Sequence, residues 1–569
     1  EAERALSTSP ELPAALFLAG ACRAKLADRD GDEAGFERAL DLLSRVRSCA
    51  GAQGTASRIA RRLGRLDEAL ELARAGLAPE AGACTRTAEV AGLALPIEAP
   101  ERALALAALA AWRARRASDP AGAAELFDEA EDALQFALGR PSDAIWVWRT
   151  LGEAYLEAGR PAKALATLED GLERLRADSG LFDLIAQAAF EVGGTPEVVG
   201  VFARVQATSP EIGLAWWYPA RAQFDAAVRG EGDARTRFGE AERAFAACRA
   251  RDARLDAACV RYEVLCRSGR GWSWLEAGEL ERAWGELHGA GEHAPGGLEL
   301  EQAPLRSARA GLVLLIERHL ARGELDGAAR AAEYLAEQFR GDVAAVRLAA
   351  DLTRDRGERQ QLLELDMKKA ARGQLRDPVR LEELRVEIGT SRPGDDLRDT
   401  PRERDRFFDI GDRRGRAARE TYLRALEHYR RALELAPNDL RLGHDAAVVV
   451  VRRLARGRPD AVVRAQPDDV VREQIDWAEA LLVRLVEVGQ RRAERGFDDD
   501  HARFAFDEAW ADAHQLLGEL VLEQRREPRA ARAWFERCLA LSPVPRPDVA
   551  DTWLPLCLAA EREAAEDRR

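Results

Sequence analysis

The chain of 569 residues lacks the long apolar runs that a membrane-spanning helix needs. Such a helix takes about 18 or more consecutive apolar residues, and the stretch AGLVLLIERHLA is interrupted by Glu317 and Arg318. Strand-favouring runs of Val, Ile, Thr and aromatic residues are also nearly absent, whereas the helix formers Ala, Leu, Arg and Glu dominate. We therefore expect an all-α protein that does not span a membrane, which leaves association with a membrane complex open.

An excess of positive charge is absent as well. The 85 lysines and arginines are outnumbered by 99 acids, and the formal net charge at pH 7 is −14. A protein that neutralises phosphates usually has the opposite balance. The composition therefore predicts no nucleic-acid partner, although the basic residues are numerous enough to form a local patch.

Catalytic and phosphate-binding motifs are missing from the chain. G-x-S-x-G, H-E-x-x-H and G-x-x-x-x-G-K-[ST] do not occur, and only four lysines are present. The sequence predicts that the protein is not an enzyme, with no catalytic residues and no cofactor.

Two acidic clusters are the candidate metal sites. DRDGDE at 28–33 resembles a calcium loop, but its glycine comes too early, and Ala39 and Leu40 stand where the closing glutamate belongs. DDDH at 498–501 could ligate a cation, but acids before a helix more often favour its N-terminus electrostatically. We expect no metal at either place. A cation-dependent enzyme that uses 498–501 is the third functional class.

Eight cysteines occur without a C-x-x-C motif, and most are expected to be small buried residues. If the protein is exported, Cys538 and Cys557 are the favoured disulfide pair, because the sequence repeats described below place them on neighbouring helices. The first residue is Glu1 and no signal-peptide pattern opens the chain, so we expect an incomplete or processed N-terminus. The compartment, cytoplasmic or periplasmic and cell-envelope, is left open.

The strongest repeated pattern lies at residues 148–176. It has the spacing W-x2-L-G-x2-Y, then a glycine at a turn and small and large apolar residues beyond it: Trp148, Leu151, Gly152, Tyr155, Gly159, Ala164 and Leu168. These residues resemble a tetratricopeptide repeat. Small side chains at Gly152 and Ala164 would let two antiparallel helices cross closely, while the large ones fill the space beside the crossing.

Similar copies follow along most of the chain, with weak copies near 100–140 and 340–380. Their marker residues include Gly64, Gly193, Gly278, Gly323, Tyr429 and Gly518. The resemblance implies a right-handed α-solenoid, a superhelix of antiparallel helix pairs. We expect an N-terminal array at 1–388, a charged linker or long loop rich in Gly and Pro at 389–416, and a C-terminal array with a terminal capping helix at 417–569.

The family resemblance also implies a concave groove lined by the first helices of successive repeats. Carried onto this chain, it gives as partner-binding residues Arg149, Glu153, Glu157, Asp183, Gln187, Phe190, Trp217, Arg221 and Phe224. The lining mixes acids and aromatics, so a basic or amphipathic segment is the expected guest. Trp217 has two interpretations: it is an exposed anchor, or the segment 226–240 folds over it.

The expected function is a non-enzymatic scaffold for protein–protein interaction, a subunit of a larger assembly that holds partner segments in the groove. The alternative is an exported component of a bacterial cell envelope or secretion system with a structural role. Tetratricopeptide domains that clamp chaperone tails use paired Lys and Asn on the groove face, but the single asparagine, Asn438, follows a second helix. Chaperone-tail binding is therefore disfavoured.

Overall fold

The computed structural model describes residues 4, 7, 8 and 12–566, apart from 47, 79–98, 139–144, 176–177, 295, 388–400, 456–468 and 498. The described residues form helices and no β-strand. They belong to two compact units, Glu1–Cys266 and Arg267–Arg569. The predicted all-α solenoid class is confirmed.

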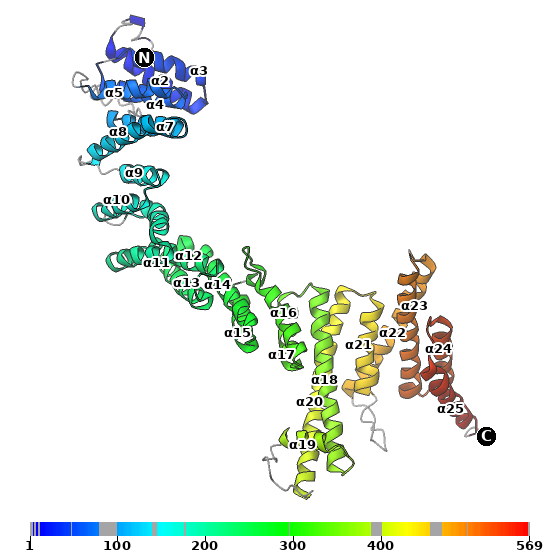
Figure 1. Cartoon of the computed structure of the whole chain (residues 1–569). Coiled ribbons are helices and arrows are strands. Elements are labelled where there is room, and N and C mark those ends of the chain that lie inside the picture. The colour runs from blue at the N-terminus through cyan, green and yellow to red at the C-terminus, as the bar shows by residue number, and fades with distance from the viewer. Residues whose placement is uncertain are drawn as a thin grey trace. The chain divides into compact units, whose positions relative to one another are not determined.

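The unit Glu1–Cys266 is built from helices that pack with their neighbours along the chain, such as α4 with α5, α7 with α8 and α9 with α10. Figure 1 labels them from blue to green. They are α2 (Pro13–Asp30), α3 (Glu33–Ser44), α4 (Ala50–Arg62), α5 (Leu66–Leu77), α7 (Pro100–Arg115), α8 (Pro120–Leu138), α9 (Ile145–Glu157), α10 (Pro161–Arg174), α11 (Phe182–Thr208), α12 (Leu214–Val228), α13 (Ala234–Arg249) and α14 (Asp256–Glu276), whose last turns belong to the second unit.

The predicted close crossing at Gly152 is present. A Cβ atom added at Gly152 on α9 would lie 2.6 Å from Cδ2 of Leu168 on α10, which is far inside van der Waals contact. Tyr155 and Leu168 are both fully buried beside this crossing. The glycine is therefore required by the approach of the two helices, as the repeat pattern predicted.

The turn glycines also behave largely as expected. Gly159, between α9 and α10, has a φ of 70°, a left-handed conformation that side chains disfavour. In the next repeat the turn was expected at Gly193, but the residue with positive φ is Gly194 (φ 66°, ψ −154°), which breaks α11 into two segments. The one-residue error arises because two adjacent glycines fit the same turn.

The unit Arg267–Arg569 contains the remaining helices, in which α18 and α20 are long and pack along each other (Figure 1). Short π-helical segments, Val449–Ala455 and Val521–Arg525, continue α21 and α23, and another, Val549–Trp553, precedes α25. The helices are α15 (Leu280–His293), α16 (Ala308–Ala321), α17 (Leu325–Gln338), α18 (Val343–Ala371), α19 (Pro378–Glu387), α20 (Pro401–Leu435), α21 (Leu440–Val448), α22 (Asp469–Arg495), α23 (Asp500–Leu520), α24 (Pro528–Leu541) and α25 (Leu554–Glu566).

The predicted loop at 389–416 is wrong from residue 401 onward, where α20 begins; residues 388–400 lie outside the described part of the chain. A seam of apolar and small residues runs through this charged stretch and faces α18. Its members follow at intervals of three or four: Phe407, Gly411, Gly415, Ala418, Tyr422, Ala425 and Tyr429. The glycines are helix-packing positions, since a Cβ on Gly415 would lie 2.5 Å from the carboxylate of Glu364 on α18.

The boundary between compact units also differs from the expected one. It falls at Cys266 and Arg267, inside α14, and not within 389–416. The packing of α18 against α20 joins the two sides of the predicted linker into one unit. From residue 401 onward, the charged segment is therefore the start of a long helix that packs along α18.

A buried histidine gives the C-terminal unit a predicted pH dependence. His514 on α23 is buried, and Nδ1 lies 2.8 Å from the carbonyl oxygen of Trp510. Burial lowers the pKa of His514 below its ordinary 6.5. The unfolded chain therefore binds the proton more readily, so the stabilising contribution is complete above pH 6.5 and is lost as the pH falls below it.

We expect urea denaturation to show a stability that falls between neutral and mildly acidic pH, and a smaller fall in His514→Gln. His501→Gln is the matched control, because His501 is exposed on the same helix. Equal pH profiles for all three proteins would contradict a role for His514.

Candidate functional site

The predicted groove residues of α9 and α11 form a connected polar cluster. Arg149 lies at its centre: Nε is 3.0 Å from Oε1 of Glu153, and Nη2 is 2.8 Å from Oδ2 of Asp183. Nη1 also donates to the backbone carbonyl oxygen of Gly180 at 2.8 Å. The arginine thus links the first helices of two consecutive repeats at the surface.

Two further polar pairs involve the same helices. Glu157 at the end of α9 pairs with Arg113 of α7, with an N–O distance of 2.7 Å. On α11, the side-chain amide of Gln187 donates to Glu191 at 3.0 Å. Exposed ion pairs of this kind contribute about 0–1 kcal/mol each. A charged side chain of another molecule could therefore replace one member of such a pair at a low cost in free energy.

Phe190 is the exposed aromatic residue of this face. Its side chain is 43% exposed on α11, and the guanidinium carbon of Arg229 lies 5.2 Å from the ring centre. An exposed aromatic ring can bury a large apolar area against another molecule. The groove prediction for Phe190 agrees with this exposure, while its role in binding remains a proposal.

The groove prediction for Phe224 is wrong. Phe224 is fully buried, with ring centres of Phe238 on α13 and Tyr262 on α14 at 5.7 and 5.1 Å. Its neighbour in the predicted set, Arg221, pairs with Asp225 at 3.3 Å and stacks on Tyr262 at 4.4 Å. The aromatic cluster of α13 and α14 therefore covers the side of α12 that the repeat frame assigned to the groove.

Trp217 is half-buried and packs into the same aromatic cluster. Its ring centre is 5.3 Å from that of Phe245 and 5.5 Å from that of Tyr262, both in edge-to-face geometry. These two contacts come from α13 and α14 beyond residue 240, and so not from the segment 226–240. Trp217 contributes to the packing of α12, and its value as a binding anchor stays a prediction.

The candidate metal clusters are occupied by other interactions. In 28–33, Asp30 pairs with Arg29 and Asp32 with Arg38, at 2.7 and 3.1 Å. Asp499 accepts a hydrogen bond from the backbone N–H of Ala502 and caps α23, while Asp498 lies outside the described residues. Within the described ranges, no group of three or more His, Cys, Asp and Glu could hold a metal ion.

The cysteines differ from the expected pairing. Cys538 and Cys557 are buried free thiols, and burial raises the pKa of each to about 11. The favoured disulfide between them is therefore not formed. Cys49, for which no pairing was predicted, is disulfide-bonded.

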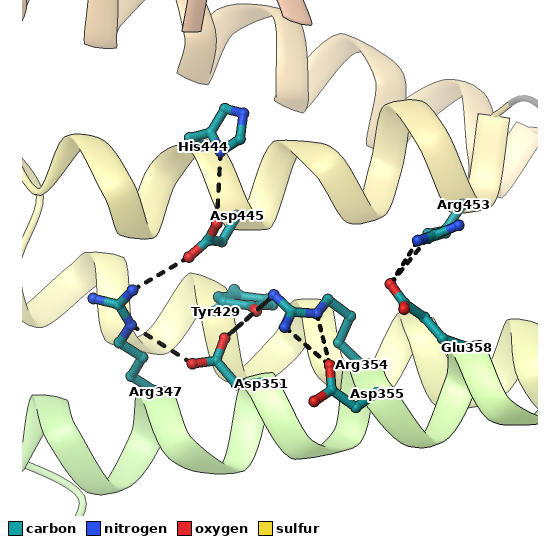
Figure 2. Close-up of polar contacts among 9 residues, drawn as sticks. All are labelled: Arg347, Asp351, Arg354, Asp355, Glu358, Tyr429, His444, Asp445 and Arg453. Atoms are coloured by element: carbon teal, nitrogen blue, oxygen red, sulfur yellow. Dashed lines mark hydrogen bonds and ion pairs between the residues drawn. The ribbon is translucent and has the colours of Figure 1, made fainter. Parts of the chain in front are cut away.

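A second polar network, which the sequence did not reveal, joins α18, α20 and α21 (Figure 2). The Tyr429 hydroxyl donates to Asp351 at 2.5 Å and accepts from Arg354 at 3.0 Å. Arg347 lies between Asp351 and Asp445, at 3.7 and 3.3 Å. Burial raises the pKa of Tyr429, which keeps the hydroxyl protonated as a donor. Each charge shown in this network faces an opposite one, so its role is to hold the three helices together.

The helix pairs, the small residue at their crossing and the left-handed turn glycine define a helical-repeat protein. The family model of the tetratricopeptide repeat matches residues 114–188, which include α8, α9, α10 and the start of α11. The chain therefore contains tetratricopeptide repeats, as the motif around Trp148 predicted.

Two solved structures are similar to the chain at low identity. A dimer of human IFIT1 with m7Gppp-AAAA is 12% identical, with a TM-score of 0.26, over 81% of this chain and 83% of that one. The APC/C hetero-tetramer Cut9–Hcn1 is 13% identical, with a TM-score of 0.22, over 96% of this chain and 84% of that one. No curated protein matches the chain.

Proposed function

We propose that the protein is a non-enzymatic scaffold that binds protein partners through the exposed first-helix face of α9 and α11, as a subunit of a larger assembly. Tetratricopeptide repeats and an all-α solenoid favour a protein–protein interaction scaffold. The observation that carries the proposal is the run of exposed charge pairs on consecutive first helices, together with the exposed ring of Phe190 on α11.

The charge of this face favours a basic or amphipathic partner segment. Glu153 and Glu157 on α9 and Asp183 and Glu191 on α11 contribute four carboxylates, and Phe190 adds an exposed ring on α11. A lysine or arginine of the partner could replace Arg149 or Arg113 against these carboxylates, and an apolar residue could cover the ring. The binding energy then comes mostly from the ring of Phe190, and the carboxylates favour a partner segment with positive charge.

The proposal predicts that Glu153→Lys/Asp183→Lys weakens capture of the native partner by at least about tenfold, because like charges would then face the basic segment. The matched control is Asp170→Lys/Glu173→Lys, which makes the same charge change on the exposed side of α10. Quantitative affinity capture from the source organism measures both. Equal loss in the two variants, or no loss in either, would refute the proposed face.

The exported alternative is favoured by one observation, the disulfide at Cys49, because disulfides persist in oxidising compartments. Thiol alkylation of the denatured, unreduced native protein distinguishes the two cases. Export predicts six alkylated thiols out of the eight cysteines, the same number as the free cysteines among the described residues. Eight alkylated cysteines would instead support a reducing compartment. Over the residues described, no helix is long and apolar enough to cross a membrane.

A further inference from the structure

A basic cavity lies in the C-terminal unit of this acidic chain. Its volume is about 660 Å³, and it is lined by residues of α21, α22 and α23 and by the turn before α21. Among the described residues that line it are four arginines, Arg441, Arg491, Arg492 and Arg495, and a single acid, Asp439. The local balance of charge is thus opposite to the net charge of −14.

None of these four guanidinium groups has a carboxylate partner in the described part of the chain. Arg492 contacts the ring of Phe497, with its guanidinium carbon 5.3 Å from the ring centre. The carboxylate of Asp439 is already used, since it accepts a hydrogen bond of 3.0 Å from the backbone N–H of Leu442 and caps α21. By contrast, Arg452 nearby in the sequence is paired with the buried Glu519 at 2.8 Å. The cavity therefore presents positive charge that the fold does not neutralise.

The basic surface extends along one face of α22. Arg484, Val488, Arg491 and Arg495 follow at intervals of four, three and four, which places them on one side of the helix. A second cavity of about 490 Å³ continues the same face toward Trp477, with Arg484 and Leu481 in its lining. From Trp477 to Arg495 the helix rises about 27 Å, the length of about eight extended residues.

We propose that this face of α22 binds an acidic peptide segment in an extended conformation. Guanidinium groups pair with carboxylates in a two-pronged fork geometry, which adds a preferred orientation to the attraction between opposite charges. Val488 and the half-buried Phe506 add apolar surface between the arginines. Because the chain as a whole has a net charge of −14, its field favours an acidic segment at this positively charged face over other parts of the surface.

The aromatic residues of the two cavities favour a peptide over a single-stranded nucleic acid. Phe506 packs against Phe497 and Trp510, with ring centres at 4.7 and 5.7 Å. Trp477 is covered by Arg430, whose guanidinium carbon lies 4.4 Å from the ring centre. Base stacking needs open aromatic faces, and these rings are engaged within the protein.

This site is independent of the proposed face on α9 and α11, which is acidic and belongs to the other compact unit. The test uses the full chain and a fluorescein-labelled peptide of about nine residues, Asp and Glu with two leucines, the length set by the α22 face. Fluorescence anisotropy at low salt measures its binding. A lysine peptide of the same design and a single-stranded RNA of similar length serve as competitors.

We expect the acidic peptide to bind and its affinity to fall at least about tenfold in Arg491→Glu/Arg495→Glu, because each lost guanidinium also becomes a repelling carboxylate. Arg424→Glu/Arg562→Glu is the control, with the same change of charge at exposed positions on α20 and α25. Circular dichroism checks that both variants stay folded. Equal binding to the two variants, no binding to the wild-type chain, or preferential displacement by the RNA would overturn the proposal.

Discussion

Replacing Lys368 by methionine is expected to lower the free energy of unfolding of the C-terminal unit by about 3–5 kcal/mol. Lys368 on α18 is 5% exposed, and its Nζ lies 2.6 Å from Oε1 of Glu364, which is 6% exposed. Asp412 on α20 is the second acid beside the ammonium group, at 2.9 Å, but it is 47% exposed. Without the lysine, Asp412 is hydrated by solvent, whereas the charge of Glu364 stays buried and loses the ammonium group that lies 2.6 Å away.

The double variant Lys368→Met/Glu364→Leu should regain most of the lost stability, because two apolar side chains can fill the space of a buried ion pair. Lys369→Met is the matched control, since Lys369 is the exposed neighbour on the same helix; we expect it to change stability by no more than about 0.5 kcal/mol. Urea denaturation followed by circular dichroism measures all three. Similar losses for Lys368→Met and Lys369→Met would show that the buried pair is not important for α18 and α20.

The second large effect is expected at the helix crossing of the best-matched repeat. Gly152→Leu should destabilise the N-terminal unit by roughly 1–3 kcal/mol, because the first added carbon already overlaps Leu168 and the rest of the side chain must displace it. Thermal melting followed by circular dichroism, with urea denaturation for the free energy, measures the change.

Gly200→Leu is the control for the Gly152 variant. Gly200 also lies within a helix of the N-terminal unit, but a Cβ there would meet no other atom within 4 Å. Since leucine is also the better helix former, this variant should be as stable as the wild-type chain or more stable. If the two variants have the same melting temperature, the inferred close crossing of α9 and α10 is contradicted.

The helix pairs could be predicted from the sequence because their cause is local. Small residues at helix crossings and glycines at several of the turns recur along the sequence, and the turn at Gly159 and the crossing at Gly152 follow directly from them. The helix at 401–416 could not be predicted in this way. Its apolar seam is interrupted by glycines and surrounded by charge, and it makes sense only when α18 lies opposite.

The candidate site was predictable in part for the same reason. Arg149, Asp183 and Gln187 are at least partly exposed, as the groove prediction requires, and their role in binding stays a proposal. Phe224 is buried instead, because α12 contacts aromatic residues of α13 and α14 that belong to later segments. The basic cavity on α22 was also invisible in the sequence, since whether an arginine has a carboxylate partner depends on which helices pack beside it.

The most direct test of the proposed scaffold is to place a photo-crosslinking amino acid at position 187 on α11 and, as control, at position 166 on the exposed side of α10. After irradiation in the source organism, mass spectrometry identifies the crosslinked partner segment. We predict a segment rich in lysine or arginine with apolar residues at position 187, and no such adduct at position 166. An acidic segment at 187, or the same adduct at both positions, would contradict partner binding by this face.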